Sequence, residues 1–184
     1  MDRDLVTRAQ RGDESAFAEL VEQVGDRLYA VAHHILSDSG RADDATQQAM
    51  IDIWRKLPSL KDPDRFLSWA YRIVVRSALT EAASRRRWFM RVTLNEAARG
   101  PASVPDHQRA YADRDELDRA LGALAIDHRT VVVLKHFADL SNSEIAEVLG
   151  VPEGTVRSRL HYAMLSLRAT LDAGGRLAAA QGEP

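Results

Sequence analysis

The stretch from Leu140 to Leu171 constrains the fold more than any other part of this chain. Ser141 followed three residues later by Glu144 is a capping box, in which each side chain satisfies an amide at a helix start. Gly150 stands where a left-handed residue ends that helix, and Pro152 suits the first turn of the next helix. Two helices joined by a tight turn in this register are typical of the helix-turn-helix motif.

The second helix of this motif combines an apolar stripe with a polar face. The stripe recurs at helical spacing through Val156, Leu160, Ala163, Met164 and Leu167. In helix-turn-helix proteins the amino-terminal half of this helix enters the major groove, where Arg reads guanine edges or holds phosphate. The candidate DNA-binding residues here are Thr155, Arg157, Ser158, Arg159, His161 and Tyr162. The alternative is an ordinary helical hairpin whose polar face is only solvated. It is less favoured, because the cap, the glycine and the proline all stand at the positions that a helix-turn-helix requires.

Charge is divided unevenly along the chain, although the net charge is only −2. Between Asp13 and Asp52, nine acidic residues stand against two Arg, whereas seven Arg and one Glu lie between Arg65 and Arg91. An acidic block followed by a basic block indicates two different partners, and the basic block suits nucleic acid. Within it, Arg85, Arg86, Arg87 and Trp88 are adjacent. Basic and aromatic side chains together suit single-stranded DNA, because charge follows phosphates and rings stack on unpaired bases.

The composition limits the class of protein. A chain of 184 residues with 45% hydrophobic content allows one or two domains with real cores. Apolar runs stay short of the roughly 18 residues of a membrane span, and we see no signal peptide. We therefore expect a cytoplasmic protein without membrane insertion. The chain has no cysteine, which excludes disulfides and thiolate metal sites.

His33 and His34 form the one tempting pair of metal ligands in the sequence. Adjacent residues of a helix point about 100° apart, so both side chains cannot easily bind one ion. No further ligand lies at a suitable sequence spacing. We therefore expect no metal site and no cofactor.

The remaining apolar residues recur at helical spacing, and no segment alternates cleanly as a strand does. The pattern predicts helices over Asp2–Leu36, with a break at Gly12-Asp13, and over Asp43–Leu57 and Phe66–Ala83, with a polar turn at residues 37–41. We predict an all-α fold of two small helical domains joined by a flexible linker. The predicted segments are residues 1–91, a Pro- and Gly-containing linker at 92–112, a second domain at 113–173, and a tail at 174–184 that begins where Gly174-Gly175 ends the ordered part.

The helix predicted over 43–57 carries acidic and amide side chains opposite its apolar face, namely Asp43, Asp44, Gln47, Gln48 and Asp52. Paired carboxylates also serve in acid–base catalysis. Because no nucleophile, metal triad or pocket motif accompanies them, we do not expect an enzyme. The acidic face suits docking to another protein.

Three stretches resemble motifs of extracytoplasmic-function sigma factors of the sigma-seventy family. RADDATQQAMIDIWR at residues 41–55 is similar to DAEDxxQExFxxxW of region 2.2, and FLSWAYRI at 66–73 is similar to FxxWLYRIA. Residues 140–160 are similar to GLSxxEIAxxLGxPxGTVxSRL of region 4.2, which is nearly complete. The resemblance covers nearly the whole chain.

The resemblance implies a bacterial transcription initiation factor with region 2 and region 4 domains. It implies that Asp43, Asp44, Gln47, Gln48 and Trp54 bind the β′ clamp helices of core RNA polymerase. It further implies contact of region 4 with the polymerase β flap and with the minus-thirty-five element, through the six residues of the second helix given above. The implied minus-ten residues are Arg72, Arg76, Thr80, Arg85, Arg86, Arg87 and Trp88. An anti-sigma partner is also implied.

Some positions depart from the family pattern. Arg76 and Thr80 stand where the family often has Asn and Asp, and Tyr162 stands where many members have a basic residue, so promoter preferences do not carry over. Other interpretations remain open. A helix-turn-helix regulator would act without being a polymerase subunit, and a response regulator would need a βα receiver domain, for which we find no strands. An enzyme or an anti-sigma-like interaction protein with the acidic helix as its active surface would need a catalytic constellation, and we find none.

Overall fold

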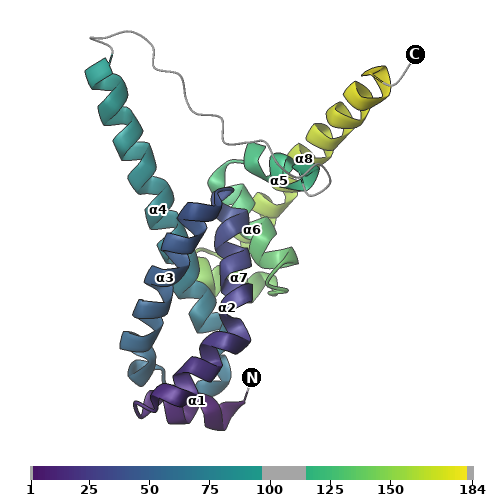
Figure 1. The fold of residues 1–184 in the computed structure, drawn as a ribbon. Coiled ribbons are helices and arrows are strands. Elements are labelled where there is room, and N and C mark those ends of the chain that lie inside the picture. Colours follow the sequence, from purple (N-terminus) through teal and green to yellow (C-terminus); the bar gives the residue numbers. More distant parts are fainter. Residues whose placement is uncertain (1, 97–114, 182–184) are drawn as a thin grey trace.

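The computed structural model describes residues 2–96 and 115–181, with side chains described for 2–84 and 117–171. The described part is helical and contains no strand, which confirms the all-α prediction (Figure 1). Its α-helices are α1 (Arg3–Gln10), α2 (Glu14–Leu36), α3 (Ser39–Lys56), α4 (Phe66–Glu96), α5 (Asp115–Ala123), α6 (Ile126–His136), α7 (Asn142–Leu149) and α8 (Glu153–Gln181). Two short 3-10 helices, Leu57–Ser59 and Pro63–Arg65, connect α3 to α4. None of the described helices is long and apolar enough to cross a membrane.

Aspartate caps set the helix starts of the first domain. Asp13 accepts a hydrogen bond from the amide of Ala16 at 3.0 Å, which confirms the predicted break between α1 and α2. Asp38 likewise accepts from the amide of Arg41 at 3.1 Å, so α3 begins at Ser39. The predicted turn at 37–41 is therefore too long, because a good cap stands in its middle.

The helix-turn-helix forms as predicted from α7 and α8. The Ser141 amide donates to Glu144 Oε2 at 2.8 Å, and the Glu144 amide donates to Ser141 Oγ at 3.3 Å, which completes the capping box. Hydrogen bonds from the Ser141 side chain and backbone hold the pKa of the Glu144 carboxyl below its ordinary value. Gly150 ends α7 in the left-handed conformation, with φ 66° and ψ 34°.

Two predicted helix ends are wrong. The α4 helix continues to Glu96 instead of ending near Ala83, so residues 92–96 of the predicted linker are helical. No glycine or proline interrupts residues 84–96, and nothing in that stretch stops a helix. The α8 helix continues through Gly174-Gly175 to Gln181, because glycine costs a helix only about 1 kcal/mol per residue. The rest of the predicted linker, 97–112, lies outside the described residues.

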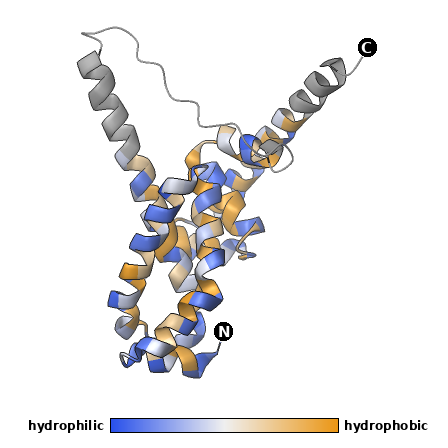
Figure 2. Cartoon of the chain, in the orientation of Figure 1, coloured by the Kyte–Doolittle hydropathy of each residue, from blue (hydrophilic) through white to orange (hydrophobic). Residues whose placement is uncertain are grey.

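The two domains pack directly against each other. In Figure 1, α2 lies between the first-domain helices α3 and α4 and the second-domain helix α6. One continuous cluster of buried side chains joins them, and it includes Leu28, Ile35 and Val74 from the first domain with Val133 and Ile145 from the second. Each described helix carries both hydrophobic and hydrophilic residues, as Figure 2 shows, so every helix has a face to bury.

Arg129 on α6 forms hydrogen bonds at the edge of this domain contact. Its Nη1 donates to the carbonyl of Ile35 at 2.9 Å and to Ser37 Oγ at 3.0 Å, at the carboxyl end of α2. Its Nη2 donates to the carbonyls of Gly122 at 2.6 Å and Leu124 at 3.1 Å, where α5 ends. Burial, and then the nearby charge of Arg41, lower the pKa of the guanidinium. A cation at two helix carboxyl ends is favourable, because unpaired carbonyls and the helix dipole meet there.

Gly150→Ala should destabilise the chain by about 1 kcal/mol, because an L side chain is strained in the left-handed conformation. A Cβ at this position meets nothing within 4 Å, so the cost is conformational and not steric. Gly154→Ala is the matched control, since Gly154 lies in α8 with equally open space and no positive φ. It should raise stability slightly. Urea unfolding midpoints measure both, and equal shifts for the two variants would contradict this account.

Arg129→Met should weaken the domain contact by about 2 kcal/mol, because hydrogen bonds from a charged donor are among the stronger ones. Met keeps the apolar stem of the side chain while removing the guanidinium. Small-angle scattering should show a larger radius of gyration, and urea unfolding a lower midpoint. Arg157→Met, on the exposed face of α8, should change neither measurement.

Candidate polymerase and nucleic-acid interfaces

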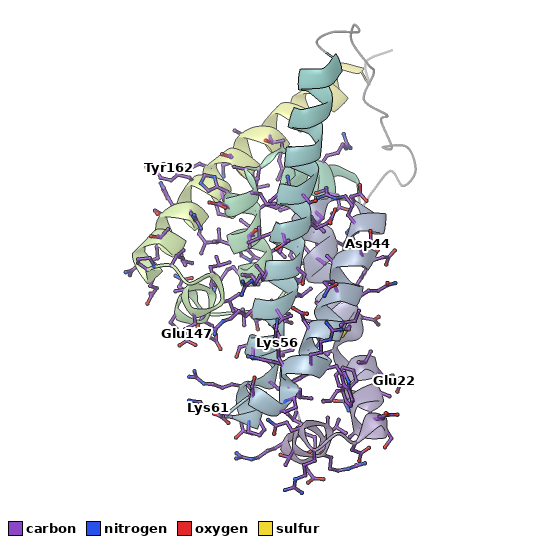
Figure 3. The ribbon with its side chains drawn as sticks, turned by 90° about the vertical axis from the view of Figure 1, so that its left-hand side faces the viewer. Glu22, Asp44, Lys56, Lys61, Glu147 and Tyr162 are labelled. Atoms are coloured by element: carbon purple, nitrogen blue, oxygen red, sulfur yellow. The ribbon has the colours of Figure 1, made fainter. Side chains whose placement is uncertain are left out.

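The outer face of α3 combines acidic, amide and apolar side chains. Asp43, Asp44 and Gln47 are exposed, and the view in Figure 3 shows Asp44 pointing outward from α3. Ile51 lies on the same face, one turn after Gln47 and two turns after Asp44, and is 46% exposed. We define the docking face as Asp43, Asp44, Gln47, Ile51 and Trp54. Sequence reasoning missed Ile51, although its spacing of four residues from Gln47 and seven from Asp44 places it on this face.

Two of the predicted α3 residues have partners within the domain. Trp54 is half-buried, and its ring lies 4.7 Å from that of Phe17 on α2, so it both packs inward and borders the docking face. Gln48 Nε2 donates to Asp52 Oδ1 at 3.3 Å, and Lys56 Nζ donates to Asp52 Oδ2 at 2.6 Å. The Lys56 hydrogen bond holds the pKa of Asp52 below its ordinary value. Gln48 therefore turns toward α4.

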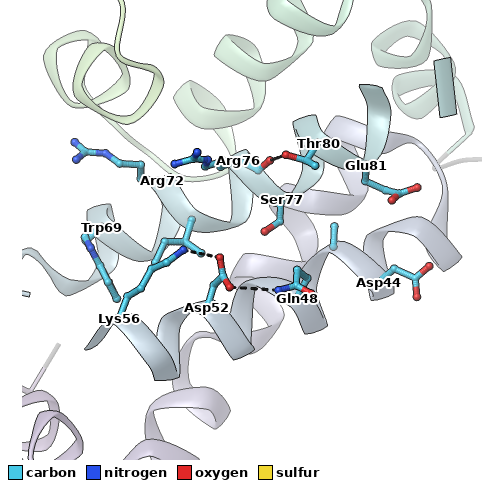
Figure 4. A pocket seen from close by; sticks show the side chains of 12 residues that line it. Asp44, Gln48, Asp52, Lys56, Trp69, Arg72, Arg76, Ser77, Thr80 and Glu81 are labelled. Carbon is cyan, nitrogen blue, oxygen red and sulfur yellow. Dashed lines mark hydrogen bonds and ion pairs between the residues drawn. The ribbon is translucent and has the colours of Figure 1, made fainter. Parts of the chain in front are cut away.

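A groove of about 560 Å³ runs between α3 and α4. Figure 4 shows Asp44, Gln48 and Asp52 on its α3 side, and Arg72, Arg76 and Thr80 on its α4 side. The structure thus brings residues predicted for polymerase docking next to residues predicted for the minus-ten element. Arg72 and Arg76 are exposed and face the acidic side chains of Asp44 and Asp52 across the groove.

The α4 residues also border the second domain. Arg72, Arg76 and Thr80 line a further groove whose other wall includes Glu147 and Gly150, around the end of α7. Thr80 Oγ1 donates to the carbonyl of Arg76 at 2.8 Å. The packed domains therefore flank this side of α4 without burying its arginines. Arg85, Arg86, Arg87 and Trp88 continue α4, and their side chains lie outside those described.

The amino-terminal half of α8 presents most of its predicted residues to solvent. Arg157, Ser158, His161 and Tyr162 are exposed, and Thr155 is half-buried. The exposed Tyr162 lies on the side of the molecule away from Asp44 (Figure 3). Ser158 Oγ donates to the Thr155 carbonyl at 3.0 Å.

Arg159 differs from the other residues predicted on this face. Its Nη2 donates to Asp127 Oδ2 on α6 at 2.6 Å, so it holds α8 against α6 instead of pointing outward.

An apolar groove of about 670 Å³ lies on the second domain, between α5, α6 and α8. Its exposed apolar side chains are Leu117, Phe137, Met164, Leu165 and Leu171. Met164 is 49% exposed, so its predicted place on the buried stripe of α8 is wrong. The stripe itself is narrower than predicted, because Val156, Ala163 and Leu167 already fill the contact with the domain core.

Two family models match this chain, one in each domain. Residues 20–89 match the family Sigma-70 region 2, and residues 114–167 match Sigma-70, region 4. The RNA polymerase sigma-H factor of Pseudomonas aeruginosa is 34% identical over 173 residues, covering 88% of this chain and 89% of its own length. The ECF RNA polymerase sigma factor SigE of Mycolicibacterium smegmatis is also 34% identical, over 85% of this chain and 63% of the relative.

This chain is an extracytoplasmic-function sigma factor. The match to region 2 excludes the alternative of a helix-turn-helix regulator that is not a polymerase subunit, because region 2 occupies the first domain. It also leaves no place for a receiver domain in the described residues, which contain no strand.

Two solved structures resemble this sigma factor over both domains. The structure of CnrH in complex with the cytosolic domain of CnrY matches with a TM-score of 0.68 and 28% identity, covering 94% of this chain and 97% of the other. The sigma factor RpoE in complex with the anti-sigma factor NepR, from Bartonella quintana, matches with a TM-score of 0.66 and 25% identity, over 85% of this chain and 96% of that one.

Proposed function

We propose that the docking face of α3 binds the β′ clamp helices of core RNA polymerase. The observation that carries this proposal is Ile51, which is 46% exposed one helical turn after the exposed Gln47 and two turns after the exposed Asp44. An apolar centre within a charged rim is the usual anatomy of a protein interface. The acidic rim would set orientation and speed of association with a basic partner. Gln48 would act from the groove behind this face.

The exposed arginines of α4 would hold the minus-ten element. Arg72 and Arg76 lie one helical turn apart and are both exposed, a spacing that suits neighbouring phosphates. Thr80 would contact DNA at the next turn. Arg85, Arg86, Arg87 and Trp88 would extend this surface to melted single strands, by charge and by stacking.

The amino-terminal half of α8 would read the minus-thirty-five element through Thr155, Arg157, Ser158, His161 and Tyr162. Arg159 would serve there as a support for the helix, since Asp127 already binds it. The apolar groove beside it is suited to a partner helix, because exposed leucines and Phe137 offer anchor positions without charge. We assign that groove to the polymerase β flap.

The packed domains suit control by an anti-sigma partner in the cytoplasm. Promoter elements of this family lie nearly two duplex turns apart, roughly 60 Å at about 34 Å per turn. With α7 beside α4, the two DNA-reading helices cannot reach both elements. A partner that holds this arrangement would prevent promoter recognition. Both similar structures contain a bound second protein, which in the RpoE structure is an anti-sigma factor.

Asp44→Arg should lower the affinity for core polymerase at least tenfold, because a reversed charge at an interface costs several kcal/mol. Ile51→Ser should lower it by about 1 kcal/mol, through lost apolar burial. Titration of labelled core enzyme measures both. Glu22→Arg makes the same charge change at an exposed position on α2 and should leave affinity unchanged. Wild-type affinity for the Asp44 and Ile51 variants would remove α3 from the interface.

Arg157→Ala should weaken use of promoters that depend on the minus-thirty-five element. If Arg157 reads a base, the loss should be about 1–3 kcal/mol and specific to one sequence position; if it holds phosphate, the loss should be uniform and the salt dependence shallower. Run-off transcription across promoter variants at two salt concentrations separates these cases. Arg11→Ala, at an exposed position after α1 in the first domain, is the control. Promoter use like the wild type's would refute both roles.

Footprinting at physiological salt tests the need for polymerase. The chain alone should protect neither promoter element, whereas the chain with core enzyme should protect both, because the net charge of −2 gives little long-range attraction to DNA. Polymerase would separate the domains and convert two weak contacts into one bivalent contact. Protection of both elements by the free chain would contradict the closed arrangement as its resting form.

A further inference from the structure

Three metal-binding side chains meet where the two domains touch. His33 and His34 come from α2 in region 2, and Asp118 comes from α5 in region 4. One ligand atom from each lies within 4.8 Å of the others, and all three residues are half-buried. The sequence showed only the adjacent histidines, because the third group is 84 residues from His34 and arrives through domain packing.

The spacing of these groups suits a four-coordinate ion. His34 Nδ1 lies 3.2 Å from Asp118 Oδ1. Neighbouring ligand atoms around a tetrahedral zinc ion, with bonds of about 2.0–2.1 Å, are about 3.3 Å apart, so this pair already has the required separation. His33 offers a ring nitrogen within 4.8 Å of the ligand atoms of both other residues. The two imidazole rings lie 5.6 Å apart at 77°, which shows that the 100° divergence of adjacent residues does not keep their rings apart.

Aromatic packing positions both imidazoles without using their nitrogens. The His34 ring lies 3.9 Å from that of Phe137, the residue that follows α6, and the His33 ring stacks on Tyr29 at 5.9 Å and 29°. Such packing fixes ring planes and limits the access of water, which strengthens a metal site. The contacts come from both domains, as the ligands do.

We propose that His33, His34 and Asp118 form a divalent transition-metal site, with Zn²⁺ as the fitting ion, that bridges the two domains. Imidazole nitrogen with carboxylate oxygen is a common zinc ligand set, and water would complete the fourth position. Since the ligands belong to different domains, the ion binds fully only when the domains are packed. Zn²⁺ at 100 times its Kd would favour the packed form about a hundredfold over the separated one. Any effect of Zn²⁺ on transcription rests on the proposed function, but the binding of Zn²⁺ to this site does not.

Titration calorimetry with Zn²⁺ alone and the metal-free full chain tests the site. We expect saturable binding of one ion, weakened at least tenfold by His33→Gln. This variant leaves the His34–Asp118 ion pair in place, so it distinguishes a metal site from a simple histidine–carboxylate contact. His136→Gln, an exposed position on α6 outside the cluster, should bind as the wild type does. No saturable binding, or equal affinity in the His33 and His136 variants, would overturn the site.

Asp118→Asn tests whether the ion bridges the domains. The chain has no cysteine, so Glu22→Cys with Ser166→Cys gives a unique pair of spin-label positions, one in each domain. Zn²⁺ should narrow the distribution of distances between the labels, and Asp118→Asn should abolish both that change and the tight binding. Tight binding that survives Asp118→Asn would place the ion on the histidines alone and overturn the bridge. Titrations of core polymerase with and without Zn²⁺ then measure polymerase affinity, which tests the proposed function separately from Zn²⁺ binding.

Discussion

The apolar contact between α2 and the second domain determines what this chain presents to its partners. Leu28 and Ile35 belong to the same buried cluster as Val133 and Ile145, so neither domain completes its core without the other in this arrangement. Apolar burial is the dominant favourable term in such a contact. Arg129 then fixes the edge by binding carbonyls at the carboxyl ends of two helices. The contact therefore combines a shared apolar core with polar contacts at its edge, among them those of Arg129 and the His34–Asp118 pair.

This contact leaves the outer face of α3 open while it flanks α4 with α7. Under the proposed roles, domain packing would affect polymerase docking and promoter reading differently. The docking face is open in the packed form, whereas reading two distant promoter elements at once would require the domains to separate. Polymerase would then bind first and separate the domains afterwards, which would order the steps of assembly.

Local chemistry made part of this structure predictable from the sequence. Ser141, Glu144 and Gly150 act within a few residues of one another, and their roles follow from backbone geometry alone. Ile51 was also within reach, since its helical spacing from Asp44 is visible in the sequence. Arg129 and Asp118 were not, because each acquires its role from residues more than 80 positions away, on the other domain. The predicted helix end at Ala83 was wrong because no breaker follows it, and the predicted end at Gly174-Gly175 was wrong because the two glycines did not stop α8.

Phe137 belongs to two surfaces at once. Its ring lies 3.9 Å from the His34 ring in the domain contact, and its side chain also lines the apolar groove on region 4. A helix seated in that groove would contact a ring whose position the domain contact helps to set, so groove occupancy and domain packing would share a free energy of coupling. By thermodynamic reciprocity, domain packing would change the affinity of the groove for its occupant by the same factor by which the occupant changes domain packing. One aromatic side chain thereby makes the two events cooperative.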